Sequence, residues 1–105
     1  MGILDRWSDG GPSPFELVTH RQDGGWVVTV SGEIDLATVG VLEAELARLQ
    51  GKPIVLDLGE VSFIDSTGLT LLVRTAGRLT IGAVSPPVAL LIETAGLGTE
   101  LRFGA

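Results

Sequence analysis

The sequence predicts a single α/β domain with a mostly parallel sheet, one antiparallel edge strand and helices packed on the sheet. A hairpin pattern follows a leader rich in Gly and Pro, and strand-like and helix-like segments then alternate. The apolar run at residues 53–58 is nearly continuous, which is typical of a strand covered on both faces. The expected order of elements is β-β-α-β-α-β-α-β. Residues 1–14 are expected to form a flexible leader, and residues 15–105 the domain.

The hairpin is predicted from alternating polarity and from turn chemistry. Residues 15–20 alternate, and the Gln-Asp-Gly-Gly sequence at 22–25 is typical of a tight turn. The second strand is expected at residues 26–31, and residues 32–35 are expected to form a loop after it. One face of the second strand would carry Trp26, Val28 and Val30.

A first helix is predicted where apolar residues recur at helical spacing. Thr38 is its candidate N-cap, and Gly51 is placed to end it near the C′ position. The covered strand at 53–58 follows. The buried positions of the helix would be Val39, Leu42, Leu46 and Leu49.

Residues 63–69, Phe-Ile-Asp-Ser-Thr-Gly-Leu, lead into a second helix. Asp65 or Ser66 can accept hydrogen bonds from the free backbone N–H groups at its start, and capping alone accounts for the polar residues here. Alternatively, Ser66 is a small nucleophile at the surface, where a phosphate would change the local charge by about −1.5 to −2. The residues by themselves favour the capping interpretation and leave the second one open.

A candidate docking patch follows from a helical wheel of this segment. If Leu69, Leu72, Val73 and Ala76 face inward, then Thr67, Leu71 and Arg74 face outward. Leu71 would be an exposed apolar residue near Ser66. Because loops at the C-terminal ends of parallel strands gather on one edge, Asp35 is expected close to Ser66.

The remaining segments complete the predicted order. Residues 78–84 are expected to form a strand. Ser85 and the two prolines after it are expected to start a third helix, whose buried face would consist of Val88, Leu91, Ile92 and Ala95. Gly96 occupies the position of a left-handed cap, with Leu97 folding back on the last turn. Residues 99–103 are expected to form a short final strand.

Composition excludes several classes of function. A net charge of −6 with seven scattered basic residues disfavours nucleic-acid binding. The chain has no Cys and one His, so no metal site is expected. It has neither Gly-x-x-x-x-Gly-Lys nor Gly-x-Gly-x-x-Gly, so no cofactor is expected. A serine hydrolase is disfavoured because His20 is distant from Ser66 and no Gly-x-Ser-x-Gly surrounds that serine. No membrane span or signal peptide is predicted, which favours a cytoplasmic protein.

Several segments together resemble the STAS domain, and more closely the bacterial anti-sigma factor antagonists. They are residues 30–38 (Val-Ser-Gly-Glu-Ile-Asp-Leu-Ala-Thr), 54–58, 63–69, 83–86 and 93–97, and the similarity covers nearly all of the chain from Phe15 to Phe103. The combination of Asp-Ser-Thr-Gly-Leu with a preceding Gly-Glu-Ile-Asp is the specific part. The resemblance implies a STAS fold and a non-enzymatic regulator of transcription.

The resemblance also implies a mechanism. In that family, the serine after the aspartate is phosphorylated by a partner anti-sigma factor, which is an ATP-dependent serine kinase. The unphosphorylated antagonist binds this partner and frees the sigma factor. Ser66 would then be the phosphoacceptor. With the predicted outward helix face included, the candidate partner-binding residues are Gly32, Asp35, Asp65, Thr67, Leu71 and Arg74.

This chain departs from the family pattern in two ways, and the second of them, a shorter helix, favours an alternative. Thr70 stands where the family usually has a small residue, often Gly, and the segment from Leu69 to Arg78 is shorter than usual by roughly two helical turns. The alternative is a STAS scaffold or regulatory subunit without a working phosphoswitch, in a stress-signalling complex or a lipid-transport ABC complex. The sequence does not specify an oligomeric state.

Overall fold

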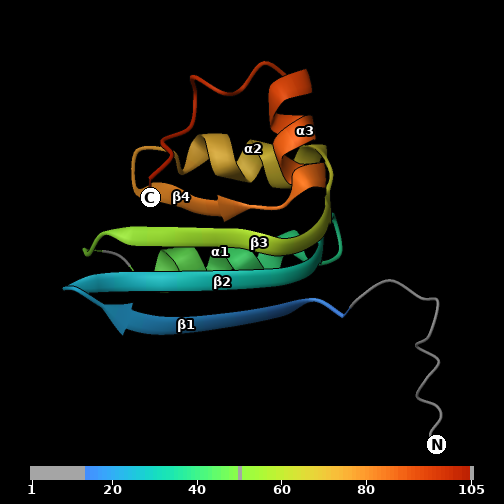
Figure 1. The fold of residues 1–105 in the computed structure, drawn as a ribbon. Coiled ribbons are helices and arrows are strands. Elements are labelled where there is room, and N and C mark those ends of the chain that lie inside the picture. The colour runs from blue at the N-terminus through green and yellow to red at the C-terminus, as the bar shows by residue number, and fades with distance from the viewer. Residues whose placement is uncertain (1–13, 50, 105) are drawn as a thin grey trace, which may run out of the picture.

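The computed structural model describes residues 14–49 and 51–104, so the expected leader lies outside the described residues except for Pro14. Within those two ranges, no helix is long and apolar enough to cross a membrane. Figure 1 shows the hairpin turn at the opposite end of the sheet from the start of the last helix. In chain order the elements are β1 (Glu16–Gln22), β2 (Gly25–Ile34), α1 (Val39–Arg48), β3 (Ile54–Ile64), α2 (Ser66–Arg74), β4 (Leu79–Val84) and α3 (Pro86–Thr94).

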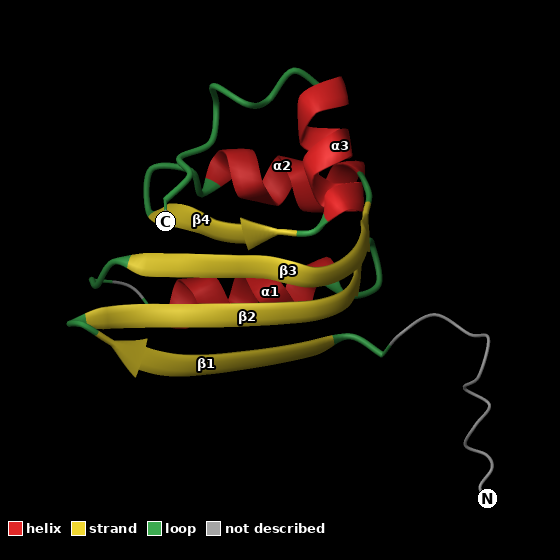
Figure 2. Ribbon diagram, in the orientation of Figure 1, coloured by secondary structure: helices red, strands yellow, loops and turns green. Residues whose placement is uncertain are grey.

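The four strands form one mixed sheet in the order β1-β2-β3-β4. The β1–β2 pair is antiparallel, whereas β2–β3 and β3–β4 are parallel and are connected through α1 and α2. Helix α1 lies behind β2 and β3 in Figure 2, and it contacts α2, while α3 packs against β3. The predicted fold class is therefore confirmed, including the single antiparallel edge.

The core lies between the sheet and the helices, and alternation along the strands determines which side chains enter it. In β2, Val28 and Val30 are fully buried, and Trp26 on the same face is partly buried. Helix α1 contributes Leu42 and Leu46 at helical spacing, as expected, whereas Val39 is only partly buried. The buried apolar residues of the first two helices are Leu42, Leu46, Leu71 and Leu72, with Leu49 just after α1.

The predicted loop at residues 32–35 is wrong for its first three residues, because β2 continues to Ile34. The strand can continue because its pairing with β3 absorbs register shifts after Thr29 and after Gly32, so that Ile34 still pairs with Ile64. Gly32 has a φ of +89° and is buried, and the backbone of Pro14 and Phe15 occupies the space a Cβ atom would need. Gly32 is thus part of the sheet and offers no exposed loop surface.

The predicted strand at residues 99–103 is reduced to one isolated parallel bridge between Ile81 and Phe103. The Ile81 N–H donates to the carbonyl of Arg102 at 2.7 Å, and the Gly104 N–H donates to the carbonyl of Ile81 at 2.9 Å. The reason is that turns after Leu97 direct Leu101 into the core. Too few residues are then left to extend along the edge of β4.

The predicted end of α3 at Gly96 is confirmed. Gly96 has a φ of +73°, its N–H donates to the carbonyl of Glu93 at 3.0 Å, and the Leu97 N–H donates to the carbonyl of Ile92 at 3.0 Å. These two bonds form a Schellman motif, which satisfies the last carbonyl groups of the helix. They also fix where the chain goes next.

Edge strand β1 is attached to α1 through a carboxylate. The Thr19 hydroxyl donates to Glu45 at 2.6 Å, and Arg48 donates to the same carboxylate through Nε at 2.9 Å and Nη2 at 2.6 Å. Chiefly the Arg48 hydrogen bond, and then the Thr19 hydroxyl, lower the pKa of Glu45 to about 2. The ionised carboxylate therefore stabilises the attachment of the edge strand.

This arrangement predicts a specific pH dependence of stability. The folded chain binds the Glu45 proton more weakly than the unfolded chain, so this contribution is complete above the ordinary pKa of 4.5 and is lost as the pH falls toward about 2. The Glu45→Gln variant retains a hydrogen-bond acceptor but does not ionise. We therefore expect its free energy of unfolding to fall less than that of the wild type as the pH is lowered from 4.5 toward about 2. Urea unfolding at pH 7, 4.5 and 3 measures the difference. Parallel pH profiles would contradict the assignment.

Candidate functional site

The start of α2 is fixed by Asp65, which the sequence left as one of two candidate caps. Its carboxylate Oδ1 accepts hydrogen bonds from the N–H groups of Thr67 at 2.9 Å and Gly68 at 3.1 Å, and from the Thr67 hydroxyl at 2.5 Å. Ser66 is the first residue of the helix, and its side chain is exposed. Because Asp65 performs the capping, the Ser66 hydroxyl is not needed for it.

Two loops meet at this edge of the sheet. The Asp65 N–H donates to the carbonyl of Ile34 at 3.1 Å, which places the end of β3 beside the end of β2. Asp35, the residue after Ile34, accepts hydrogen bonds at Oδ1 from the N–H groups of Ala37 at 3.0 Å and Thr38 at 3.2 Å. The expectation that Asp35 lies close to the Asp65-Ser66 pair is therefore confirmed.

Thr38 closes the Asp35 loop instead of capping α1. It stands at the N-cap position of α1, but its side chain accepts no hydrogen bond from the helix. Its hydroxyl donates to the carbonyl of Glu33 at 2.8 Å and accepts from the Asp35 N–H at 3.0 Å. The predicted side-chain cap is thus wrong, because the hydroxyl is used within the tight turn that precedes the helix.

Asp65 is held in its charged form. The hydrogen bond from the Thr67 hydroxyl is the largest effect and lowers its pKa; burial, the second largest, raises it, and the N–H groups of Gly68, Thr67 and Leu36 lower it further. The Leu36 N–H belongs to the Asp35 loop, so this loop contributes directly to the charge at the start of α2. Ser66 therefore stands next to a carboxylate that is ionised at neutral pH.

The expectation that Leu71 is an exposed docking residue is wrong, since only 1% of it is exposed. The buried face of α2 consists of Gly68, Leu71 and Leu72, and Leu69 and Val73 are only partly buried. The helix is rotated relative to the prediction because Gly68 lets it approach the sheet closely. A helical wheel that is oriented by its apolar residues alone does not identify a glycine as a buried position.

The exposed ridge of α2 is formed by Ser66, Thr70 and Arg74, which follow one another at intervals of four residues. We call these three residues the α2 ridge. A groove of about 310 Å³ on one side is lined by Val39, Glu43 and Thr67 together with the ridge. A groove of about 290 Å³ on the other side is lined by Leu69, Val73 and Leu97 together with the ridge.

The other sequence-predicted residues of the helix differ in exposure. Arg74 is exposed as expected, and its Nη2 lies 3.2 Å from a carboxylate oxygen of Glu43 on α1. Thr67 is partly buried, and its hydroxyl is occupied by Asp65. Of the residues predicted on the outward face, only Arg74 is therefore openly accessible.

Sequence reasoning missed two exposed apolar residues at this end of the sheet. Leu36, in the Asp35 loop, is 78% exposed, and Phe63, near the end of β3, is 45% exposed. Both stand in the segments that carry the family pattern. The sequence carries no signal for this exposure, because an isolated apolar residue in a short loop is as compatible with burial as with exposure.

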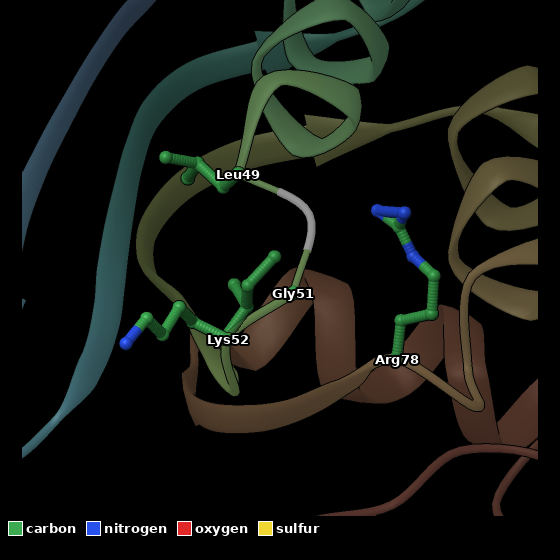
Figure 3. A pocket seen from close by; sticks show the side chains of 5 residues that line it. Leu49, Gly51, Lys52 and Arg78 are labelled. Carbon is green, nitrogen blue, oxygen red and sulfur yellow. The ribbon is translucent and has the colours of Figure 1, made fainter.

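A cavity of about 280 Å³ near the end of α1 carries two cationic residues, Lys52 and Arg78. Figure 3 shows that their side chains point in different directions. The Arg78 guanidinium donates to the carbonyl of Leu46 at 2.9 Å, where it stabilises the end of α1. The two cations therefore do not converge on an anion. Elsewhere in the described part of the chain, no group of His, Asp or Glu side chains is suited to hold a metal ion.

The family model and the related proteins that match this chain point to the same family. The family model described as "Mlab, STAS domain" matches residues 17–102. An anti-sigma-B factor antagonist of Staphylococcus aureus is 37% identical over 93 residues, covering 79% of this chain and 86% of that protein. An anti-sigma F factor antagonist of Paenibacillus polymyxa is 31% identical over 94 residues, covering 79% of each chain.

Solved structures give the same result. An anti-sigma factor antagonist from Mycobacterium paratuberculosis superposes with a TM-score of 0.78 at 27% identity, covering 88% of this chain and 87% of that one. The anti-sigma factor antagonist SpoIIAA in its unphosphorylated form superposes with a TM-score of 0.64 at 25% identity, covering 88% and 89%. The similarity thus extends over nearly the whole described domain.

Replacing Asp65 separates capping from charge. We expect Asp65→Ala to lower the free energy of unfolding by about 0.5–2 kcal/mol, because two helix N–H groups lose their acceptor. Asp65→Asn should retain most of the stability, since asparagine caps helices about as well as aspartate. Urea unfolding at pH 7 measures both. An equal loss in the two variants would show that the carboxylate acts through its charge and not as a cap.

Replacing Gly68 tests the close approach of α2 to the sheet. An added Cβ would lie 2.6 Å from Cγ1 of Ile64 and 2.8 Å from Cγ2 of Ile34, so Gly68→Ala should destabilise the fold by about 1–3 kcal/mol despite the better helix propensity of alanine. Gly40→Ala in α1 is the matched control, because nothing lies within 4 Å of its added Cβ. Thermal unfolding should show opposite signs, and a Gly68→Ala protein as stable as the control would refute the contact.

Proposed function

Since the chain belongs to the STAS domain family of anti-sigma factor antagonists, we propose that it binds a cognate anti-sigma factor while Ser66 is unphosphorylated. In this proposal the anti-sigma factor is also an ATP-dependent serine kinase, and its phosphorylation of Ser66 releases the chain. Members of this family are non-enzymatic regulators of transcription, and they bind anti-sigma factors. The identity of Ser66 as the acceptor, the kinase partner and a cytoplasmic site of action are parts of the proposal.

The observation that carries the proposal is the contrast between two adjacent hydroxyls. Thr67 donates its hydroxyl to Asp65 and is partly buried. Ser66 is exposed, and its hydroxyl has no hydrogen-bond partner among the described residues. A kinase that approaches this edge of the sheet can therefore reach Ser66 without breaking a bond on which the helix depends.

The free chain should tolerate a phosphate at Ser66. The N-terminus of a helix carries a partial positive charge that favours an anion, and Ser66 is exposed and takes no part in the cap that Asp65 forms. A phosphate at this position adds about −1.5 to −2 charge at neutral pH. The fold should therefore persist after phosphorylation.

In a docked complex the same phosphate would be unfavourable. It would be desolvated by the partner, and it would stand beside the ionised carboxylate of Asp65 and close to Asp35. A loss of about 2.7 kcal/mol in binding free energy corresponds to a hundredfold weaker complex. Phosphorylation could thus switch binding without any change of shape.

The short second helix is the observation that favours the alternative, a STAS scaffold or regulatory subunit of another system. Helix α2 has nine residues, so the α2 ridge ends at Arg74 and offers a partner only two further turns after Ser66. A partner that used a different face would not require a phosphoswitch. A stable complex with a transporter ATPase, or with a stress-signalling assembly, in the absence of phosphate transfer would support this alternative.

The proposal predicts opposite effects of two substitutions at Ser66. Ser66→Asp should weaken binding to the purified anti-sigma factor by roughly a hundredfold, because it places a negative charge in the interface. Ser66→Ala should bind as the unphosphorylated wild type does, and it should no longer be released through a phosphate on residue 66. Isothermal titration calorimetry measures both affinities.

The control for these variants is thermal unfolding, which should be nearly unchanged in each, since Ser66 is exposed and does not cap the helix. Thr67→Val is a matched variant, and it should lower stability because it removes a hydrogen bond to Asp65. If Ser66→Asp bound the partner as tightly as the wild type, the charge switch would be refuted.

A further inference from the structure

Thr70 carries a free hydroxyl one helical turn beyond Ser66. Three threonines lie in or next to α2, and two of them use their hydroxyls, because Thr67 donates to Asp65 at 2.5 Å and Thr75 donates to the carbonyl of Leu71 at 2.8 Å. The Thr70 hydroxyl has no hydrogen-bond partner among the described residues, and the side chain is exposed. Thr70 thus shares with Ser66 the two properties that make a hydroxyl available to a kinase.

Ser66 and Thr70 also share their surroundings. Both residues line the groove toward α1 and the groove toward Leu97. Residues four apart on a helix are neighbours, with their Cβ atoms about 5–6 Å apart. A protein that covers Ser66 therefore also covers Thr70.

Arg74 stands one further turn along the α2 ridge. Its terminal nitrogens Nη2 and Nη1 lie 3.2 Å and 3.3 Å from the same carboxylate oxygen of Glu43, and both side chains are about half exposed. An anion four residues before a cation is the favourable order for a helical pair, and a guanidinium binds phosphate oxygens in a bidentate manner. A phosphate on Thr70 would thus meet a cation that at present binds only a solvent-exposed carboxylate.

We propose that Thr70 is a second phosphoacceptor on this face, and that its phosphate takes the Arg74 guanidinium from Glu43. The inference rests on the proposed function, because the same ATP-dependent kinase must dock on the α2 ridge. In the reaction, Thr70 Oγ1 forms a bond to the γ-phosphorus of ATP as the bond from that phosphorus to the β,γ-bridging oxygen breaks. ADP leaves, and the hydroxyl proton passes to a base of the kinase.

The second phosphate would extend the charge switch along the helix. A Ser66 phosphate acts at the helix N-terminus, where the dipole favours it. A Thr70 phosphate would instead place charge in the middle of the ridge and leave Glu43 without its cation. The doubly phosphorylated chain should therefore bind the partner more weakly than the chain phosphorylated at Ser66 alone.

The test is phosphorylation by the purified anti-sigma factor kinase with Mg-ATP, followed by intact mass and fragment mass spectrometry. The wild type should gain up to two phosphates, Ser66→Ala one on Thr70, Thr70→Val one on Ser66, and the double variant none. Phosphate on Ser66 alone in every preparation would overturn this inference and leave the proposed function intact. Absence of phosphate on the wild type would refute the proposed function itself.

A second measurement tests the role of Arg74. In phosphorylated Ser66→Ala, ³¹P NMR titration should give a phosphothreonine pKa below the usual value of about 6, because the guanidinium stabilises the dianion. Arg74→Gln should return that pKa to its usual range, and Glu43→Gln, which removes the competing carboxylate, should not. Equal phosphothreonine pKa values with and without Arg74 would overturn the proposed pairing.

Discussion

The close approach of α2 to the ends of β2 and β3 is the constraint on which the candidate site depends. Gly68 has no side chain, so the first turn of the helix lies directly over Ile34 and Ile64. The hydrogen bond from Asp65 to Ile34 joins the two strand ends at the same point. These contacts orient the first turn so that Asp65 faces the backbone and Ser66 faces outward. The accessibility of Ser66 is therefore a consequence of how the core is packed beneath it.

Three neighbouring polar residues at the start of α2 have different structural roles. Asp65 satisfies the free N–H groups, and Thr67 stabilises Asp65 through its hydroxyl. Ser66 lies between them and contributes to neither interaction. A residue with no structural role can be modified at little cost to stability. This separation of roles reconciles the two interpretations of the motif, since capping and the proposed phosphorylation involve different side chains.

Local chemistry was enough to predict the order of the first seven elements, the capped start of α2 and the left-handed end of α3, because each depends on a few adjacent residues. The rotation of α2 could not be predicted, since it depends on Gly68 meeting side chains from two distant strands. The length of β2 could not be predicted, because its pairing with β3 tolerates register shifts that the amino-acid composition does not reveal. In the same way, the last strand was lost because burial of Leu101 took precedence over pairing.

The cap of α3 has a consequence for the groove beside Ser66. Leu97 is fixed by its hydrogen bond to Ile92, and it forms one wall of that groove, whose opposite wall is α2. The width of the groove is thus influenced by a helix that contributes no residue to the proposed phosphorylation site. Fraying of the last turn of α3 would widen the groove while the serine and its acidic neighbours kept their positions. The C-terminal part of the chain can in this way influence which partners fit, independently of the state of the hydroxyl.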